Sequence, residues 1–510
     1  MSHRRFLLSL SVILFSSALA LALVIVVQPI PRAAAAPLTQ VRYVNDNAAG
    51  GNSGASWANA FTHLQDALAA AQSGDEIWVA SGVYTPGASV KDSFQLKDGV
   101  ALYGGFAGNE TSREQRDWQA NVTVLSGDID GNDGVDANGV VTNTDTITGT
   151  NAGSVLNGSG TDATAILDGF TITAGAGSFG GGMRNSQGSP TLAHLIFSGN
   201  RAGFGGGLYN TLSSPRLTQV SFIHNYANFG GGMWNDNNSR PTLNQVLFDG
   251  NAGVFGGGLG NSDASPTLFQ ATLVNNTASS GGGMYNSNAS RPAVTNASIR
   301  GNYASASGGG MYNVNSSLAV TNTIFSGNRA GAHGGGIQNI DIAFITVTNA
   351  IFSGNRAGSD GGGMMNLRST PTIHNSIFWN NWDSRNDPAS ASMRNGDSAP
   401  TVDYSLVQGC NPGGVWQSAC GADGGNNLAD GDPLFIGPVD PTTAPTTTGN
   451  LRLWAGSPAL DTGNNSFITG IATDLEGNPR IVNGTVDLGA YEAPANPPIP
   501  ERVFLPLMQR

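Results

Sequence analysis

The residues best suited to hold a metal ion lie in one acidic loop. Carboxylates and an amide alternate there with glycine, and flexible chains with oxygen ligands of this kind suit Ca²⁺. The spacing departs from that of the EF-hand loop and no Glu closes it, so a solvated insertion is the alternative. Calcium is the one cofactor that the sequence suggests. Its candidate ligands are Asp128, Asp130, Asn132, Asp133 and Asp136.

Four aromatic residues recur at the same place in a repeated motif, one residue after the Met or Leu that follows three glycines. Neighbouring residues of a strand point to opposite faces, so if the Met or Leu points inward, the aromatic ring points outward. A row of exposed rings on a flat face can bind glycans by stacking on sugar rings. Ordinary aromatic residues of a sheet surface are the alternative. The row is Tyr209, Trp234, Tyr285 and Tyr312, with a gap at Gly260.

Acids and bases are sparse in the repeated part of the chain. Polysaccharide cleavage needs clustered carboxylates that hold Ca²⁺ beside a base, or a pair of carboxylates. Residues 180–366 hold five acids, and only Asp236 and Asp263 approach equivalent positions of neighbouring repeats. Arginines and histidines at repeated positions are interpreted as corner or surface residues. They are Arg201, Arg329, Arg356, His194, His224 and His374.

The repeat that carries these residues has a fixed period. Three glycines, an apolar residue, a variable residue and an asparagine occur eight times, at steps of 25 to 27 residues. A period of this size is typical of a solenoid, and alternating short segments predict strands with one inward face. The glycine triplets begin at Gly180, Gly205, Gly230, Gly256, Gly281, Gly308, Gly334 and Gly361.

Each period contains three positions rich in amides, which predicts a three-sided coil. The first column runs from Asn185 to Asn366. The second is an Asn placed three residues after a large apolar residue, as in Phe197 and Asn200. Asn tolerates left-handed backbone geometry, which suits corners, and stacked Asn side chains can bond from coil to coil at a spacing of ~4.8 Å. The third column is His194, Gln219, Gln245, Gln270, Asn296, Asn322, Asn349 and Asn375.

The glycine triplets need a reason, because glycine weakens a strand. A large residue often precedes the triplet, and we expect the missing side chains to leave space for these rings. The rings are Phe179, Phe204, Phe229 and Phe255.

The amino terminus has the layout of a secretory signal. Arg4 and Arg5 precede an uncharged apolar run from Phe6 to Val27, and small residues follow. We expect no membrane span in the mature chain unless this run stays uncleaved. The formal net charge is −12 and no basic patch indicates nucleic acid. Cys410 and Cys420 are close enough in sequence to form one disulfide in an oxidising compartment, with two free thiols as the alternative.

The chain divides at changes of pattern. Apolar residues at helical spacing before Gly74 predict a short capping helix, and strands should follow it. The expected parts are a signal peptide (1–36), a cap with the first coils (37–106), an irregular insertion with early coils (107–170), regular repeats (171–382), C-terminal coils (383–495) and a Pro-rich tail (496–510).

The motifs resemble known families. The Phe-x-x-Asn and Gly-Gly-Gly-[Leu/Ile/Met] pairs look like the repeats of polymorphic outer-membrane proteins, which belong to the pectin-lyase-like superfamily. Residues 67–77 are similar to the capping helix and first strand of that superfamily. Residues 456–463, 474–480 and 487–492 resemble the choice-of-anchor Q region of bacterial surface proteins. The resemblance implies an all-β, right-handed parallel β-helix and a cell-surface location.

The expected function follows from these features. The leading hypothesis is a secreted or cell-surface, non-catalytic adhesive β-helix that binds an extracellular glycan or a partner protein on its aromatic face. The alternative is a polysaccharide lyase or glycoside hydrolase, with its chemistry near residues 128–136 or 397–432.

Overall fold

The protein is described by a computed structural model, which covers residues 40–341 and 344–499. The expected signal peptide and most of the Pro-rich tail lie outside these ranges. Within them, no helix combines the length and apolar character needed to cross a membrane.

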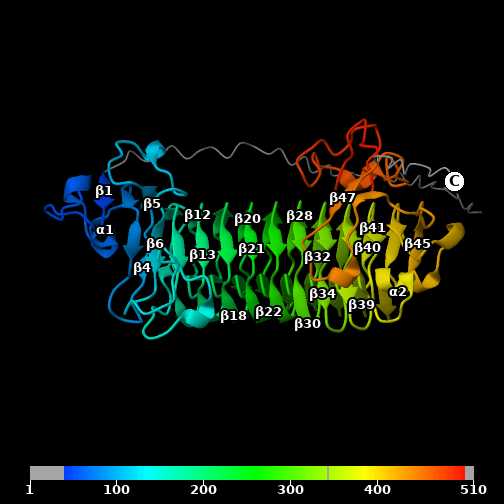
Figure 1. The fold of residues 1–510 in the computed structure, drawn as a ribbon, viewed down its shortest axis with the longest axis horizontal. Helices are drawn as coiled ribbons and strands as arrows, with labels where there is room; N and C mark the ends of the chain where they lie inside the picture. Colours follow the sequence, from blue (N-terminus) through cyan, green and yellow to red (C-terminus); the bar gives the residue numbers. More distant parts are fainter. Residues whose placement is uncertain (1–39, 342–343, 500–510) are drawn as a thin grey trace, which may run out of the picture. The chain divides into compact units, whose positions relative to one another are not determined.

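Short strands stack into four parallel sheets that together form a β-helix (Figure 1). One coil passes in turn through sheets A, B, C and D, and the next coil repeats the path in register. The solenoid predicted from the period and the all-β parallel β-helix implied by the resemblance are confirmed. The coil has four strands and not three, because the glycine triplet forms a turn between sheets C and D where the sequence predicted a strand interior.

Sheets A and B hold the longest series of strands. Sheet A consists of β1 (Val41–Val44), β2 (Glu76–Ala80), β5 (Ala101–Phe106), β8 (Ile166–Asp168), β12 (Thr191–Ala193), β16 (Arg216–Thr218), β20 (Thr242–Asn244), β24 (Thr267–Phe269), β28 (Ala293–Thr295), β32 (Leu318–Thr321), β36 (Ile345–Thr348), β40 (Thr372–His374), β43 (Thr401–Asp403) and β45 (Ala422–Gly425). Sheet B consists of β3 (Gly82–Tyr84), β6 (Thr123–Ser126), β9 (Thr171–Thr173), β13 (Ile196–Ser198), β17 (Ser221–Ile223), β21 (Leu247–Asp249), β25 (Thr272–Val274), β29 (Ser298–Arg300), β33 (Ile324–Ser326), β37 (Ile351–Ser353), β41 (Ile377–Trp379) and β44 (Leu406–Val407).

Sheets C and D complete each coil. Sheet C consists of β10 (Ala176–Phe179), β14 (Arg201–Phe204), β18 (Tyr226–Phe229), β22 (Ala252–Phe255), β26 (Thr277–Ser280), β30 (Tyr303–Ser307), β34 (Arg329–Ala330) and β38 (Arg356–Ala357). Sheet D consists of β4 (Phe94–Gln95), β7 (Leu156–Asn157), β11 (Met183–Ser186), β15 (Leu208–Thr211), β19 (Met233–Asp236), β23 (Leu259–Ser262), β27 (Met284–Ser287), β31 (Met311–Val314), β35 (Ile337–Ile340), β39 (Met364–Leu367) and β42 (Met393–Gly396).

Helices are few and short. The predicted capping helix is present as α1 (Leu64–Ala70), although β1 precedes it and pairs with β2. The other helices are α2 (Pro388–Ser392) and the 3-10 helices η1 (Trp57–Asn59), η2 (Arg113–Gln115), η3 (Thr144–Thr146), η4 (Pro412–Gly414), η5 (Ser418–Cys420), η6 (Pro441–Thr443) and η7 (Asn465–Ile468).

Two long buried asparagine ladders run through the coils, and a short third one joins Asn349, Asn322 and Asn296 of the third column. In the first, each side-chain Nδ2 donates to Oδ1 of the next Asn, from Asn185 to Asn210 at 3.2 Å and onward to Asn395. In the second, which runs from Asn200 to Asn381, Oδ1 also accepts the backbone N–H of the preceding Asn. The ladder prediction is confirmed, and these bonds satisfy polar groups inside an apolar core. Phe side chains at the predicted positions stack beside the second ladder, with ring centroids 4.2 to 5.0 Å apart.

The prediction of left-handed backbone at the amide corners is confirmed for the third column and is wrong for the two long ladders, whose Asn residues have no positive φ. The third column has φ between +46° and +55° at all eight positions and forms the corner between sheets A and B. At the turn between sheets C and D, Gly180 has φ of +62°, and an added Cβ would collide with the carbonyl oxygen of Met183. A Cβ on Gly182 would lie 2.6 Å from the Gly207 carbonyl oxygen and 2.7 Å from the Phe197 ring. The idea that Phe179 and its equivalents fill this space is therefore wrong: the next coil and the core fill it.

The coils end at β45, and residues 433–499 form a C-terminal lobe where further coils were expected (orange to red in Figure 1). Its strands β46 (Phe435–Gly437) and β47 (Asn450–Leu453) are antiparallel. Apolar lobe residues cover Ile324, Ile351 and Ile377 on the outside of sheet B. A disulfide joins Cys410 to Cys420 at the end of the coils.

Candidate glycan-binding groove

Two rows of aromatic side chains meet outside the turn between sheets C and D. The Phe row ends the first strands of sheet C, and its rings stack with centroids 4.6 to 5.4 Å apart. The Tyr/Trp row lies on sheet D. Rings of the two rows are in contact: Phe179 lies 5.1 Å from Tyr209, and Phe229 lies 5.3 Å from Trp234. The Phe row is Phe179, Phe204, Phe229 and Phe255, and the Tyr/Trp row is Tyr209, Trp234, Tyr285 and Tyr312.

The expectation of a fully exposed aromatic face is wrong for half of the Tyr/Trp row. Tyr209 is 7 % exposed and Trp234 is 4 % exposed, because the Phe row covers them. Tyr285 and Tyr312 are half-buried and stack at 5.5 Å, as expected for neighbouring coils. Phe179, at the amino-terminal end of the Phe row, is 40 % exposed.

The Trp234 side chain fills the gap that Gly260 leaves in the Tyr/Trp row. The Trp234 ring lies over this glycine, where an added Cβ would collide with the indole. Trp234 therefore contacts Tyr285, two coils away, at a centroid distance of 6.5 Å. Tyr209 and Trp234 occupy adjacent coils, as predicted, but their rings make no contact with each other among the described residues. The row is continuous from Trp234 to Tyr312.

A hollow of about 350 Å³ opens beside the continuous part of the row. Trp234 and Tyr285 form its aromatic wall, and Asp236, Ser262 and Ser287 supply polar groups. Burial raises the pKa of Asp236, and the nearby charge of Asp263 adds to that effect. The two acids that the sequence placed at nearby positions are thus electrostatically coupled.

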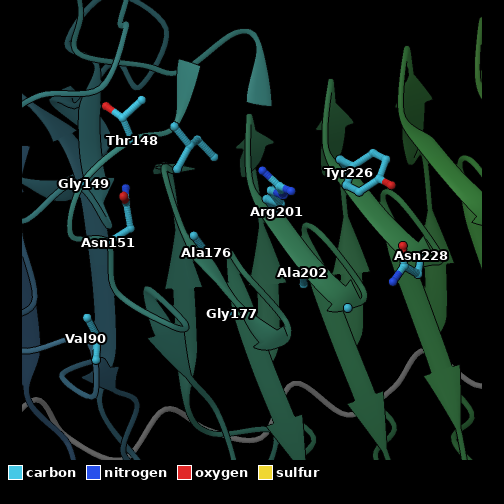
Figure 2. A pocket seen from close by; sticks show the side chains of 12 residues that line it. Val90, Thr148, Gly149, Asn151, Ala176, Gly177, Arg201, Ala202, Tyr226 and Asn228 are labelled. Carbon is cyan, nitrogen blue, oxygen red and sulfur yellow. The ribbon is translucent and has the colours of Figure 1, made fainter. Parts of the chain in front are cut away.

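A second hollow of about 650 Å³ lies on the outer face of sheet C (Figure 2). Its floor is formed by β10, β14 and β18, and residues 147–151 with Val90 border it. Figure 2 shows Arg201 and Tyr226 side by side on neighbouring strands, and the Arg201 guanidinium lies 5.9 Å from the Tyr226 ring centroid. A third hollow, of about 320 Å³, shares Val90 with the second and reaches Phe179. The second and third hollows thus share one lining residue, and the Phe row leads from Phe179 at the third hollow to Phe204 and Phe229 at the first.

The acidic loop builds the border of the second hollow. Asp133 accepts hydrogen bonds from the Thr148 backbone N–H at 2.6 Å and from Asn151 Nδ2 at 2.6 Å. Asp130 accepts one from the Thr150 backbone N–H at 2.9 Å. Asp128 accepts backbone N–H groups of its own loop. These bonds hold residues 148–151 against the loop.

Calcium in this loop stays a prediction. The remaining candidate ligands are Asn132, whose Oδ1 accepts a hydrogen bond from the Thr148 hydroxyl, and Asp136, which accepts the Val140 N–H. Burial raises the pKa of Asp133, and the charges of Asp128 and Asp130 contribute to the shift.

Among the described residues, three acidic ligand atoms come within 4.8 Å of one another in the C-terminal lobe and not in this loop. The three residues are Asp461, Asp487 and Glu492. The buried Arg480 supplies the counter-charge there, since its Nη1 donates to Glu492 at 3.0 Å. The C-terminal sequence motifs therefore meet in a charged network in which Arg480, Asp487 and Glu492 are buried and Asp461 is exposed.

The repeated basic residues lie where the period placed them. Arg329 and Arg356 are register partners on sheet C, and Arg201 occupies the same column. His194 and His374 pair with Asp168 and Asp403, at Nδ1–Oδ1 distances of 2.8 and 2.5 Å. Sequence analysis missed these acids as partners because each lies one coil away from its histidine.

Comparisons with known proteins give weak matches, and these are to solved structures alone. No protein-family model matches the chain, and no curated protein matches it. Among solved structures, a pectate lyase matches at 14 % identity with a TM-score of 0.40, over 89 % of this chain and 96 % of that chain. The family 28 exopolygalacturonase of Yersinia enterocolitica matches at 11 % identity with a TM-score of 0.28, over 72 % and 78 % of the two chains. Arguments about function therefore rest on the residues of this chain.

Proposed function

We propose that this chain is an exported, non-catalytic surface protein that binds an extended glycan along the groove between sheets C and D. The observation that carries the proposal is the pair of contacting aromatic rows outside the turn between sheets C and D, with one hollow at Phe179 and another beside Trp234 and Tyr285. Half-buried rings with polar neighbours suit sugars, whose rings have an apolar face and a polar edge.

The repeat of the groove favours an extended ligand. Coils follow one another at ~4.8 Å, and stacked rings of the Phe row are 4.6 to 5.4 Å apart. A chain that runs along the β-helix axis meets an equivalent contact at every coil. Several weak contacts of this kind add up along one ligand.

The lining of the groove favours binding over cleavage. Among the residues that line the three hollows, Asp236 is the one acid; the nearby Asp263 is outside that lining and accepts a hydrogen bond from Asn238 Nδ2. Glycoside hydrolysis needs two carboxylates, about 5–9 Å apart across the bond. Cleavage by a lyase or hydrolase, with chemistry on the flanking coils, is the competing proposal. Binding of a partner protein on the same face is a further alternative to glycan binding.

The surface location is part of the proposal. The secretory layout of residues 1–36, the polymorphic outer-membrane-type repeats and the choice-of-anchor Q-like motifs support export and display at a cell surface. The lobe that contains those motifs packs on sheet B, whereas the groove lies between sheets C and D.

Affinity electrophoresis in gels that contain neutral or acidic polysaccharides tests the proposal. The wild-type protein should be retarded by at least one polysaccharide, and Tyr285→Ala/Tyr312→Ala should lose most of the retardation. Phe269→Ala, which removes an exposed ring on sheet A, is the matched control and should behave as wild type. Release of shortened products, with or without Ca²⁺, would favour the enzyme. No retardation by any polysaccharide would overturn glycan binding.

A further inference from the structure

A separate hollow of about 420 Å³ lies on the outside of sheet A, near the amino-terminal end of the coils. Tyr103 of β5 and Asp168 of β8 supply its floor. The segment of residues 107–122, which follows β5, supplies Arg113, Arg116 and Trp118. Sequence analysis treated this segment as an irregular insertion and assigned nothing to it.

Among the residues that line this hollow, Arg116 and Asp168 have a structural role. Arg116 Nη1 donates to the carbonyl oxygens of Gly104 and Asp168, and Nη2 forms an ion pair with Asp168 Oδ1 at 2.8 Å. His194 Nδ1 approaches the same Oδ1 at 2.8 Å. These contacts fasten the segment to sheet A. They use up Arg116 and one oxygen of Asp168.

Other polar atoms around the hollow stay free. Asp168 Oδ2, Arg113 Nε and Trp118 Nε1 make no hydrogen bond with any described residue. Arg113 keeps 40 % of its side chain exposed although its Nη1 donates to Glu76 and to the Tyr103 hydroxyl. A loop fastened to a sheet needs none of these atoms. Donors and an acceptor without a protein partner thus belong to residues that line one hollow.

The aromatic walls are also defined. The Trp118 ring lies against His194, with centroids 5.4 Å apart. The Arg113 and Arg116 guanidinium carbons lie 4.8 and 5.1 Å from the Tyr103 ring centroid, which holds these planar groups in place. The site therefore combines an indole with planar polar groups in fixed positions.

The charge balance selects the ligand class. Glu114 also lines the hollow. Arg113 is paired with Glu76 and Glu114, and Arg116 is paired with Asp168, so the hollow offers no excess positive charge to an anion. Planar carboxylate and guanidinium groups bond well to pairs of neighbouring hydroxyls, and an indole stacks on the apolar face of a sugar ring. We propose that this hollow is a second, pocket-type site for a neutral saccharide of one or two residues. The site is independent of the groove between sheets C and D.

Isothermal titration of the full mature chain with a panel of neutral mono- and disaccharides tests the site. At least one sugar should saturate the wild-type protein. Trp118→Ala should weaken that binding about tenfold or more, which is the scale of losing an anchoring aromatic residue. Trp118→Phe, which keeps a stacking ring, should retain most of it. Unchanged far-UV circular dichroism of both variants would establish that the fold is kept.

The groove variant separates the two proposals. Tyr285→Ala/Tyr312→Ala should bind the small sugar as the wild type does, even where it has lost retardation by polysaccharides. The site is refuted if no sugar of the panel saturates the wild type, or if Trp118→Ala binds as tightly as the wild type. Tighter binding of inorganic sulfate than of any neutral sugar would also overturn the assignment.

Discussion

Replacing Asn276 with Ala removes one step of the second asparagine ladder. Its Oδ1 accepts hydrogen bonds from the backbone N–H and Nδ2 of Asn251, both at 3.0 Å. Its Nδ2 donates to the Phe248 carbonyl oxygen at 3.0 Å and to Asn302 Oδ1 at 2.9 Å. The side chain is fully buried, so four buried hydrogen bonds are lost together.

The cost follows from which partners are left unpaired. Asn251 Nδ2 still donates to the Phe222 carbonyl oxygen, and Asn302 Oδ1 still accepts the Asn276 backbone N–H. The Asn251 backbone N–H loses its only acceptor among the described residues. A buried unpaired group costs about 1–3 kcal/mol, and the lost volume of the amide adds to this. We expect the free energy of unfolding to fall by about 2–5 kcal/mol.

Urea unfolding followed by far-UV circular dichroism measures this change. The matched control is Asn275→Gly, at the neighbouring exposed corner with φ of +56°. Glycine occupies the equivalent position in most coils and tolerates left-handed backbone, so the control should stay within about 0.5 kcal/mol of wild type. A loss below about 1 kcal/mol for Asn276→Ala, or equal losses for the two variants, would refute the reasoning about the ladder.

Three further predictions concern the aromatic rows, the acidic loop and the lobe. Trp234→Ala should lower the free energy of unfolding by about 3 kcal/mol, because the ring is buried. An unchanged urea midpoint would contradict the conclusion that the Phe row buries the Trp234 ring. If the Asp128–Asp136 loop binds Ca²⁺, millimolar Ca²⁺ should raise the melting temperature above that measured with a chelator. Equal melting temperatures would contradict calcium binding by this loop. Burial raises the pKa of Glu492 to about 7. The folded state then holds more protons than the unfolded state between pH 4.5 and 7, so stability should fall as pH rises through that range. Glu492→Gln should flatten this part of the profile measured by thermal unfolding, and an equally steep profile in the variant would assign the pH dependence to other groups.

The repeated parts of the fold could be predicted from the sequence because every coil carries the same residue types at the same positions. The Asn and Phe columns recur at a fixed period, so their stacking followed from strand spacing alone. The fourth side of the coil is not evident from the sequence, because a glycine triplet beside apolar residues is compatible with a strand as well as with a turn. Only the left-handed backbone of Gly180 and its equivalents shows that they form a turn.

The geometry of the candidate sites was harder to predict from the sequence, because it depends on contacts between side chains of different strands and segments. The sequence pattern places Trp234 on the outward face of its strand. Its burial could not be predicted, because the Phe229 ring that packs on it comes from a different strand. Trp118 lies in a segment without a period. The docking of the lobe did leave a signal: Ile324-Phe325 and Ile351-Phe352 are consecutive apolar pairs, which indicates a strand covered on both faces.

The most direct test of the account measures binding of a polysaccharide to the wild-type protein and to Tyr285→Ala/Tyr312→Ala under the same conditions. The account predicts that the wild type binds and that the double variant, still folded by circular dichroism, loses most of the affinity while Phe269→Ala keeps it. Equal binding by all three proteins would contradict a glycan site in the groove between sheets C and D.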